Sequence, residues 1–329
     1  MTRIVLSTGN IVSGGPSIIR KPGTYRSNLE LTNSLRSNFL AAKEDYAAAL
    51  ENGNGNGDAA HHASENGTNG RGLNGNSRTA TSVWTAREGS VLYVPRINWA
   101  TAGLQEDRTQ YEITVKLFFL PTAPLEKRPE YIREALRLVT KELGVDTVDL
   151  LIVSFPGISF EGDCEWEANK RNAAMGDEAE ELWTWAVLED LHMQGRISRL
   201  GIAEFGSEKL QRFIGKVRVR PAVDQINIKN CCSVPPPLAK LAKEEGIELY
   251  THGDCTDILP RGTLRELLGH GLQGAGVLAD DESEGRGLSG DLVPEWVAKY
   301  TAFVQDRGVI ENKGYFAGAE LMEGGYVSD

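Results

Sequence analysis

The chain has 329 residues, of which 40% are hydrophobic, so it can bury a large core. Its formal net charge of −11 argues against nucleic acid or an anionic membrane surface as a partner. The four cysteines have no CxxC spacing, which fits a reducing cytosol better than a disulfide framework or a zinc ribbon. We find no apolar run of membrane-spanning length and no signal peptide, and we therefore expect a cytoplasmic protein.

The first quarter of the chain combines two regular elements with a long polar insertion. Residues 3–7 predict a short strand, and residues 27–50 carry apolar side chains at helical spacing. Residues 51–77 are rich in asparagine and glycine and almost devoid of large apolar residues, which predicts a disordered loop inserted in the domain. His61 and His62 lie in this loop without a fixed carboxylate or thiol partner, so we expect solvent exposure and no metal.

Strands and helices alternate after this insertion. The apolar patterns predict strands at residues 90–98, 112–120 and 148–155, and helices at residues 128–143 and 182–194. Residues 161–176 are polar and irregular, which predicts a loop over one face of the domain.

The stretch from Gly201 to Cys255 repeats one plan three times. Short apolar strands at residues 200–202, 223–228 and 247–250 are separated by helices at residues 207–214 and 237–245. Strands that alternate with helices of this length indicate βαβ units and a parallel sheet. We therefore predict an α/β fold, a (β/α)₈ TIM barrel formed as one domain over residues 1–329. For the end of the chain we expect helices at residues 263–270 and 296–305, and a last strand that starts at residues 308–310.

Several passages resemble the signature passages of the aldo-keto reductases in the same order: VDLLIV, GRISRLGIAEF, RPAVDQIN and IELYTHG. This resemblance implies an NADPH-dependent barrel in which an Asp-Tyr-Lys-His set acts and the tyrosine is the general acid. Lys116 matches the family lysine, but Ser154 stands at the position of the family histidine. Asp107 and Tyr111 do not have the spacing of the family Asp-Tyr pair.

The cofactor positions that the resemblance implies are only partly kept. Gln225 and Tyr250 match cofactor-facing positions, whereas Ala203-Glu204 replaces the Ser-Asn pair that holds the nicotinamide amide. General acid catalysis needs a positioned proton donor, which a lone lysine does not provide. We therefore expect no catalytic residue and no bound cofactor, with Lys116 as a barrel-mouth lysine paired with a carboxylate. The alternative is an NADPH-dependent oxidoreductase with a rebuilt site.

A narrower resemblance rests on DQINIKNCCSVPPPLAKLAKEEGIELYTHGD and EWVAKYTAFVQDRGVIENKGY, with LSTGN and VKLF. These passages are similar to the regulatory (modifier, or light) subunits of glutamate–cysteine ligase. The resemblance covers most of the chain outside the asparagine- and glycine-rich insertion and the glycine-rich loop before Trp296. It implies a non-catalytic subunit that forms a heterodimer with the catalytic subunit of the ligase. In that role it improves the use of glutamate and relieves feedback inhibition by glutathione.

The loop that follows the strand at residues 223–228 is the expected contact with the partner, through Lys229 and Asn230. Cys231 and Cys232 in the same loop have two interpretations: a redox-sensitive contact such as an intersubunit disulfide, or small apolar groups packed in the interior. A reactive thiol needs exposure and a lowered pKa. A bridge between the two is disfavoured, because adjacent cysteines point away from each other.

The insertion gives a first prediction. Deleting Gly53 to Asn76 and joining the ends with a short linker should change the melting temperature little, because the deleted residues contribute no core contacts. Differential scanning calorimetry of the two proteins measures this. A large drop in melting temperature would show that the insertion is packed.

Overall fold

The structure is a computed structural model that describes residues 2–13, 26–51, 80–160, 165–227, 234–255, 257–271, 273–279 and 287–322. The predicted insertion at residues 51–77 therefore lies outside the described residues, apart from the helical backbone of Glu51. The same holds for these residues discussed above: His61, His62, Lys229, Asn230, Cys231 and Cys232. Expectations about these residues stay predictions.

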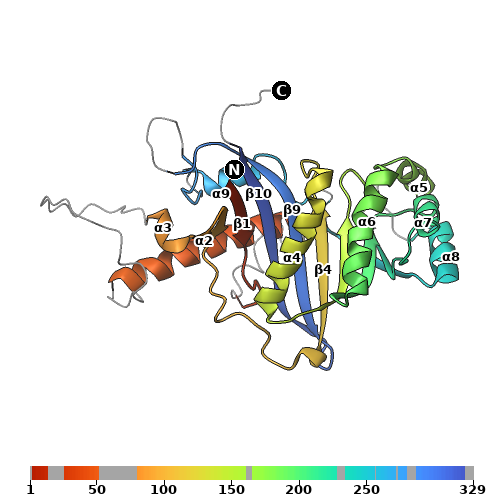
Figure 1. Cartoon of the computed structure of the whole chain (residues 1–329), viewed down its shortest axis with the longest axis horizontal. Helices are drawn as coiled ribbons and strands as arrows, with labels where there is room; N and C mark the ends of the chain where they lie inside the picture. Colours follow the sequence, from red (N-terminus) through yellow and green to blue (C-terminus); the bar gives the residue numbers. More distant parts are fainter. Residues whose placement is uncertain are drawn as a thin grey trace, which may run out of the picture.

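Within these described ranges, ten strands form one mixed sheet in the order β2-β3-β1-β10-β9-β4-β5-β6-β7-β8 (Figure 1). Their bounds are β1 Thr2–Ser7, β2 Ala86–Glu88, β3 Val91–Val94, β4 Tyr111–Phe119, β5 Val148–Ser154, β6 Ile197–Ala203, β7 Val223–Asn227, β8 Glu248–His252, β9 Asp291–Val304 and β10 Val309–Met322. The helices are α2 Ser27–Glu51, α3 Thr81–Trp84, α4 Arg128–Leu143, α5 Glu165–Ala173, α6 Glu178–Met193, α7 Ser207–Ile214, α8 Pro236–Glu245 and α9 Thr263–Leu268.

The five strands from β4 to β8 are parallel neighbours, and α4, α6, α7 and α8 connect them in turn. This half confirms the predicted βαβ units, and the bounds of α4 and α7 agree with the predicted helices. Gly144 ends α4 in the left-handed conformation (φ 64°), which glycine adopts without steric cost. The α/β fold expected from the sequence is therefore present.

The other half contains a long antiparallel hairpin, β9–β10, inserted between β1 and β4. The helix predicted at residues 296–305 is wrong, because this segment is the second part of β9. Alternate residues of β9 are buried against one core, namely Trp296, Ala298, Tyr300, Ala302 and Val304. That spacing has the period of two of a strand, and the valines, aromatic residues and threonine also favour a strand.

The strand order departs from that of a closed barrel. β2 and β8 are the two edges of the sheet, and within the described residues no hydrogen-bonded ladder joins them. β4 pairs with the antiparallel β9 on the side away from β5, so the parallel strands cannot continue there into a ring. The parallel strands consequently form an open, curved sheet.

Helices cover both faces of the sheet. In Figure 1, α4 lies in front of the central strands and α2 behind them, with α5 to α8 grouped at the right. Tyr315 and Phe316, neighbours on β10, are buried on opposite faces: Phe316 in the core of α4 and α6, Tyr315 in the core of α2 and α9. A third, small cluster of Leu150, Ile152, Ala203 and Val223 occupies the concave side of β5–β7.

Candidate functional site

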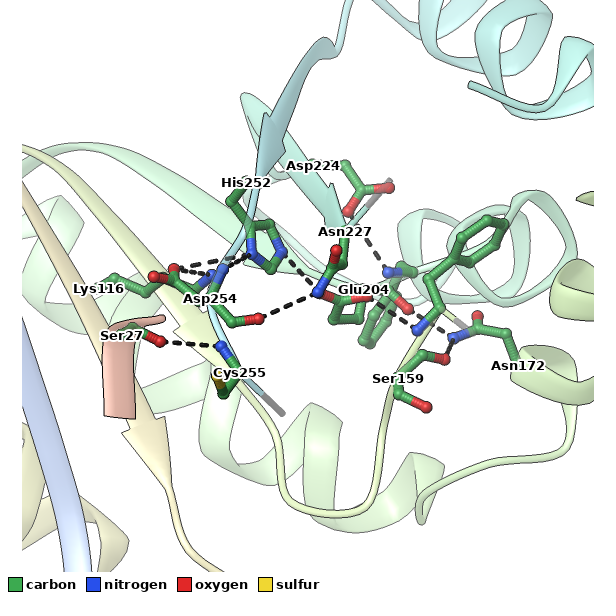
Figure 2. Close-up of polar contacts among 12 residues, drawn as sticks. Ser27, Lys116, Ser159, Asn172, Glu204, Asp224, Asn227, His252, Asp254 and Cys255 are labelled. Carbon is green, nitrogen blue, oxygen red and sulfur yellow. Dashed lines mark hydrogen bonds and ion pairs between the residues drawn. The ribbon is translucent and has the colours of Figure 1, made fainter. Parts of the chain in front are cut away.

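A buried ion-pair cluster lies on the concave side of the parallel strands (Figure 2). Asp254, two residues after β8, accepts hydrogen bonds from Lys116 Nζ at 2.9 Å and from Lys299 Nζ at 2.8 Å. The two lysines are direct cross-strand partners on β4 and β9, a placement in which like charges repel. The Asp254 carboxylate between them removes this repulsion.

This contact requires the sheet to curve. β8 lies four strands from β4, which corresponds to about 19 Å in a flat sheet. Curvature brings the end of β8 back to β4 and β9, where side chains rather than a backbone ladder make the connection. On the same side, Arg199 of β6 contacts Glu112 of β4 at 2.9 Å and Glu248 of β8 at 3.1 Å.

His252, at the end of β8, extends the cluster. Its Nδ1 accepts a hydrogen bond from the backbone N–H of Asp254 at 3.1 Å, so a neutral ring carries its hydrogen on Nε2. Nε2 lies 2.6 Å from Glu204 Oε1, just beyond the end of β6. The side chains of Lys116, Lys299, Asp254 and Glu204 thus surround the imidazole of His252.

Glu204 has a left-handed backbone, with φ 67°, although it is not glycine. Such a conformation costs about 1–3 kcal/mol and persists only where the surroundings impose it. Asn172 of α5 imposes it here, since its Nδ2 donates to the Glu204 carbonyl at 2.5 Å and its Oδ1 accepts from the Gly206 N–H at 2.6 Å. The Glu204 side chain also accepts a hydrogen bond from the backbone N–H of Phe160 at 2.8 Å.

The irregular loop predicted at residues 161–176 is therefore wrong in part, because α5 occupies residues 165–173. This helix is mostly polar and gives little apolar signal in the sequence. It is held by Ala168, which packs against Phe160, and by the amides of Asn169 and Asn172, which bind the turn before α7.

Burial and the neighbouring positive charges shift the pKa of Asp254 in opposite directions. Burial raises the pKa of its carboxyl group, but the charges of Lys116 and Lys299 outweigh this effect and hold the pKa well below its usual range. Burial lowers the pKa of Lys116, against the opposing effect of Asp254. We therefore describe Asp254 as ionised and bound by both lysines at neutral pH.

The predicted site residues do not converge on a reaction centre. Lys116 has the carboxylate partner that we expected, whereas Ser154 ends β5 as a half-buried residue with no acid–base partner described. The Tyr250 hydroxyl donates to Glu248 at 2.7 Å, and the buried amide oxygen of Gln225 has no hydrogen-bond partner among the residues that the structure describes.

No described tyrosine combines the features of the family's general acid. Tyr111 donates to Glu311 at 2.8 Å, at the end of β4 that is far from Asp254. Tyr315 lies opposite Lys299 in the β9–β10 ladder, but its hydroxyl donates to Glu30 at 2.9 Å. Burial and the charge of Glu30 raise the pKa of Tyr315 well above its usual value, which weakens it as an acid at neutral pH.

The residues present do not fit a nicotinamide cofactor. A nicotinamide amide needs both a donor and an acceptor, but Ala203 offers no polar side chain. The Glu204 carboxylate only accepts hydrogen bonds, and Phe160 and His252 already occupy it. We derive no chemical step through this cofactor.

The Aldo/keto reductase family matches residues 96–265, more than half of the chain. The chain belongs to the aldo/keto reductase family. The match contains β4 to β8 and the helices between them, together with Lys116, Glu204, His252 and Asp254. The antiparallel hairpin β9–β10 and helix α2 lie outside it.

Two relatives with curated names are designated as regulatory subunits and not as reductases. A Mus musculus glutamate–cysteine ligase regulatory subunit is 26% identical over 215 residues, which cover 65% of this chain and 68% of that protein. A Schizosaccharomyces pombe protein named for the same role is 29% identical over 238 residues, covering 69% of this chain and 77% of that protein. Among solved structures, an aldo-keto reductase from a deep-sea metagenome library superposes with 20% identity and a TM-score of 0.32. That superposition covers 44% of this chain and 45% of the other.

Sequence reasoning did not single out Asp254 or Lys299. Asp254 follows a strand end without forming a motif, and Lys299 lies in the segment predicted to be helical. Among the described residues there is no cluster of three or more His, Cys, Asp or Glu side chains suited to a metal ion. None of the helices within those residues is long and apolar enough to cross a bilayer.

Replacing Asp254 by asparagine tests the cluster. Asp254→Asn should lower the free energy of unfolding at neutral pH by about 3–5 kcal/mol, because it leaves a buried ammonium without its counter-charge. Denaturant unfolding measures the change. The exposed Asp257 provides a matched control, and Asp257→Asn should change stability little.

The contribution of Asp254 to the free energy of unfolding should change with pH in a defined direction. Because the folded-state pKa of Asp254 lies below its ordinary value of 3.8, its stabilising contribution is complete above that value and is lost as the pH falls through the folded-state pKa. The difference between wild type and Asp254→Asn should thus be constant from about pH 8 to about pH 5 and shrink in stronger acid. A difference that vanishes near neutral pH would contradict the assignment.

Proposed function

We propose that this chain is a non-catalytic regulatory subunit of glutamate–cysteine ligase, acting in glutathione biosynthesis through a heterodimer with the catalytic subunit. The observation that carries the proposal is the similarity to relatives named for this role, which extends over about two thirds of both chains. We place the complex in the cytoplasm.

The geometry of the family site supports a role without catalysis. The lysine that family enzymes use is buried between Asp254 and the Phe118 ring, whose centre lies 5.0 Å from Nζ. Ser154 replaces the histidine, and Glu204 occupies a position that faces the cofactor in family enzymes. A scaffold that keeps the family fold without this reactive set is free to serve as a binding surface.

Regulation in this form needs only preferential binding. A subunit that binds the catalytically competent state of its partner more tightly than other states shifts the partner towards that state. Improved use of glutamate and weaker inhibition by glutathione both follow if that state binds glutamate better and glutathione worse. No reacting group is required from this chain.

We place part of the interface between Asp224 and Asp254, which contains loops at the carboxyl ends of β7 and β8. Lys229 and Asn230 are the proposed contacts, and Cys231 and Cys232 are candidates for a redox-sensitive contact. Complementary charge orients an encounter more than it adds affinity. The net charge of −11 favours a partner that presents a basic surface.

Titration into the isolated catalytic subunit tests the proposal. Wild-type protein should raise the ligase rate at limiting glutamate, and Lys229→Glu or Asn230→Arg should shift the titration to higher concentration without changing the circular dichroism spectrum. Glu208→Gln, an exposed change on α7, serves as the control and should titrate like wild type.

The outcomes separate two claims. If both loop variants assemble and activate like wild type, the interface lies elsewhere on the chain. If wild type neither binds nor activates the catalytic subunit, the proposed function is wrong.

Family membership favours an NADPH-dependent oxidoreductase as a second candidate. The engaged Lys116 and the raised pKa of Tyr315 speak against it, since such a reaction needs a proton donor that is active near neutral pH.

A further inference from the structure

A separate pocket lies beside α2, between the loops that follow the adjacent parallel strands β1 and β3. Its volume is about 380 Å³, and Glu142 near the end of α4 contributes to its lining. In α/β sheets, crevices outside the carboxyl ends of parallel strands are frequent ligand sites. The pocket shares no lining residue with the ion-pair cluster at Asp254.

The sequence of α2 explains why a pocket forms beside this helix. Asn38, Ala41, Ala42 and Asp45 recur at the spacing that places side chains on one helix face, and all four line the pocket. The two alanines fill little space between the longer polar side chains. Loop residues 95–102 form the facing wall.

Glu142 is a carboxylate without a cationic partner in the described part of the chain. The ammonium of the adjacent Lys141 lies over the Trp99 ring, 4.3 Å from its centre, and does not pair with Glu142. Burial raises the pKa of Glu142, partly offset by the Tyr300 hydroxyl. A partly buried carboxylate that lines a pocket is a suitable partner for a ligand's positive charge.

Arg96 supplies the opposite charge in the same lining. Its guanidinium reaches the Thr85 carbonyl only at 3.4 Å and lies 5.6 Å from the centre of the Tyr46 ring. Among the described residues it has no carboxylate partner. Arginine is well suited to bind a carboxylate through paired N–H groups.

We propose that this pocket binds a free amino acid, whose α-ammonium group pairs with Glu142 and whose α-carboxylate pairs with Arg96. Asp45, a second acid in the lining, favours a basic side chain on the ligand and disfavours an acidic one. A pocket of this volume holds one molecule of this size. The proposal adds a ligand site to the chain and does not depend on its assembly with a ligase.

Isothermal titration calorimetry of the full chain tests it, with L-lysine as the probe. L-lysine should bind saturably, and L-glutamate more weakly. Nα-acetyl-L-lysine, which lacks the α-ammonium group, and L-lysinamide, which lacks the carboxylate, should each bind at least about tenfold more weakly, because each leaves a pocket charge unpaired.

Variants locate the site. Glu142→Gln and Arg96→Met should each weaken L-lysine binding about tenfold, whereas Glu44→Gln, an exposed change on α2 outside the lining, should bind like wild type. The ligand series on wild type gives a result even if a variant does not fold. Absence of saturable binding up to about 10 mM, or equal binding of L-lysine and its Nα-acetyl form, overturns the proposal. Binding unchanged in Glu142→Gln also overturns it.

Discussion

The contact of Asp254 with Lys116 and Lys299 joins the two halves of the molecule. It links the end of the last parallel strand, β8, to the neighbouring strands β4 and β9, although β5, β6 and β7 lie between β8 and β4 in the sheet order. Next to it, the backbone N–H of Cys255 donates to Ser27 Oγ at 2.8 Å, which attaches the start of α2 to the same point. Because no ladder closes the sheet among the described strands, these side-chain contacts hold its curvature.

In this arrangement Lys116, the match to the family lysine, supports the fold through its contact with Asp254. A buried ion pair is costly to break, so Lys116 stays with Asp254. His252 and Glu204 extend the same network and occupy the space near the ends of β6 and β8. The proposed contacts with a partner and with a free amino acid lie outside this network, in the loop after β7 and in the pocket beside α2.

The sequence predicted local structure better than long-range contacts. α4, α7 and the parallel strands were predictable because apolar spacing and glycine or proline boundaries act over a few residues. β9 was mistaken for a helix because its apolar residues are nearly continuous from Trp296 to Ala298. α5 was missed because it buries few apolar residues and is held largely by hydrogen bonds of Asn169 and Asn172 to the start of α7. The pairing of Lys116 was foreseen, but its partner was not, since only the curvature of five strands brings Asp254 to it. No sequence pattern over a few residues predicts that Asp254 lies close to Lys116.

Oxidation of NADPH by the purified chain tests the central claim that Lys116 is structural rather than catalytic. With simple aldehydes as substrates, the account predicts no carbonyl-dependent oxidation by wild type above the level of Lys116→Met, with circular dichroism used to verify that the variant is folded. Robust turnover by wild type that a folded Lys116→Met variant loses would contradict the account and establish an active reductase.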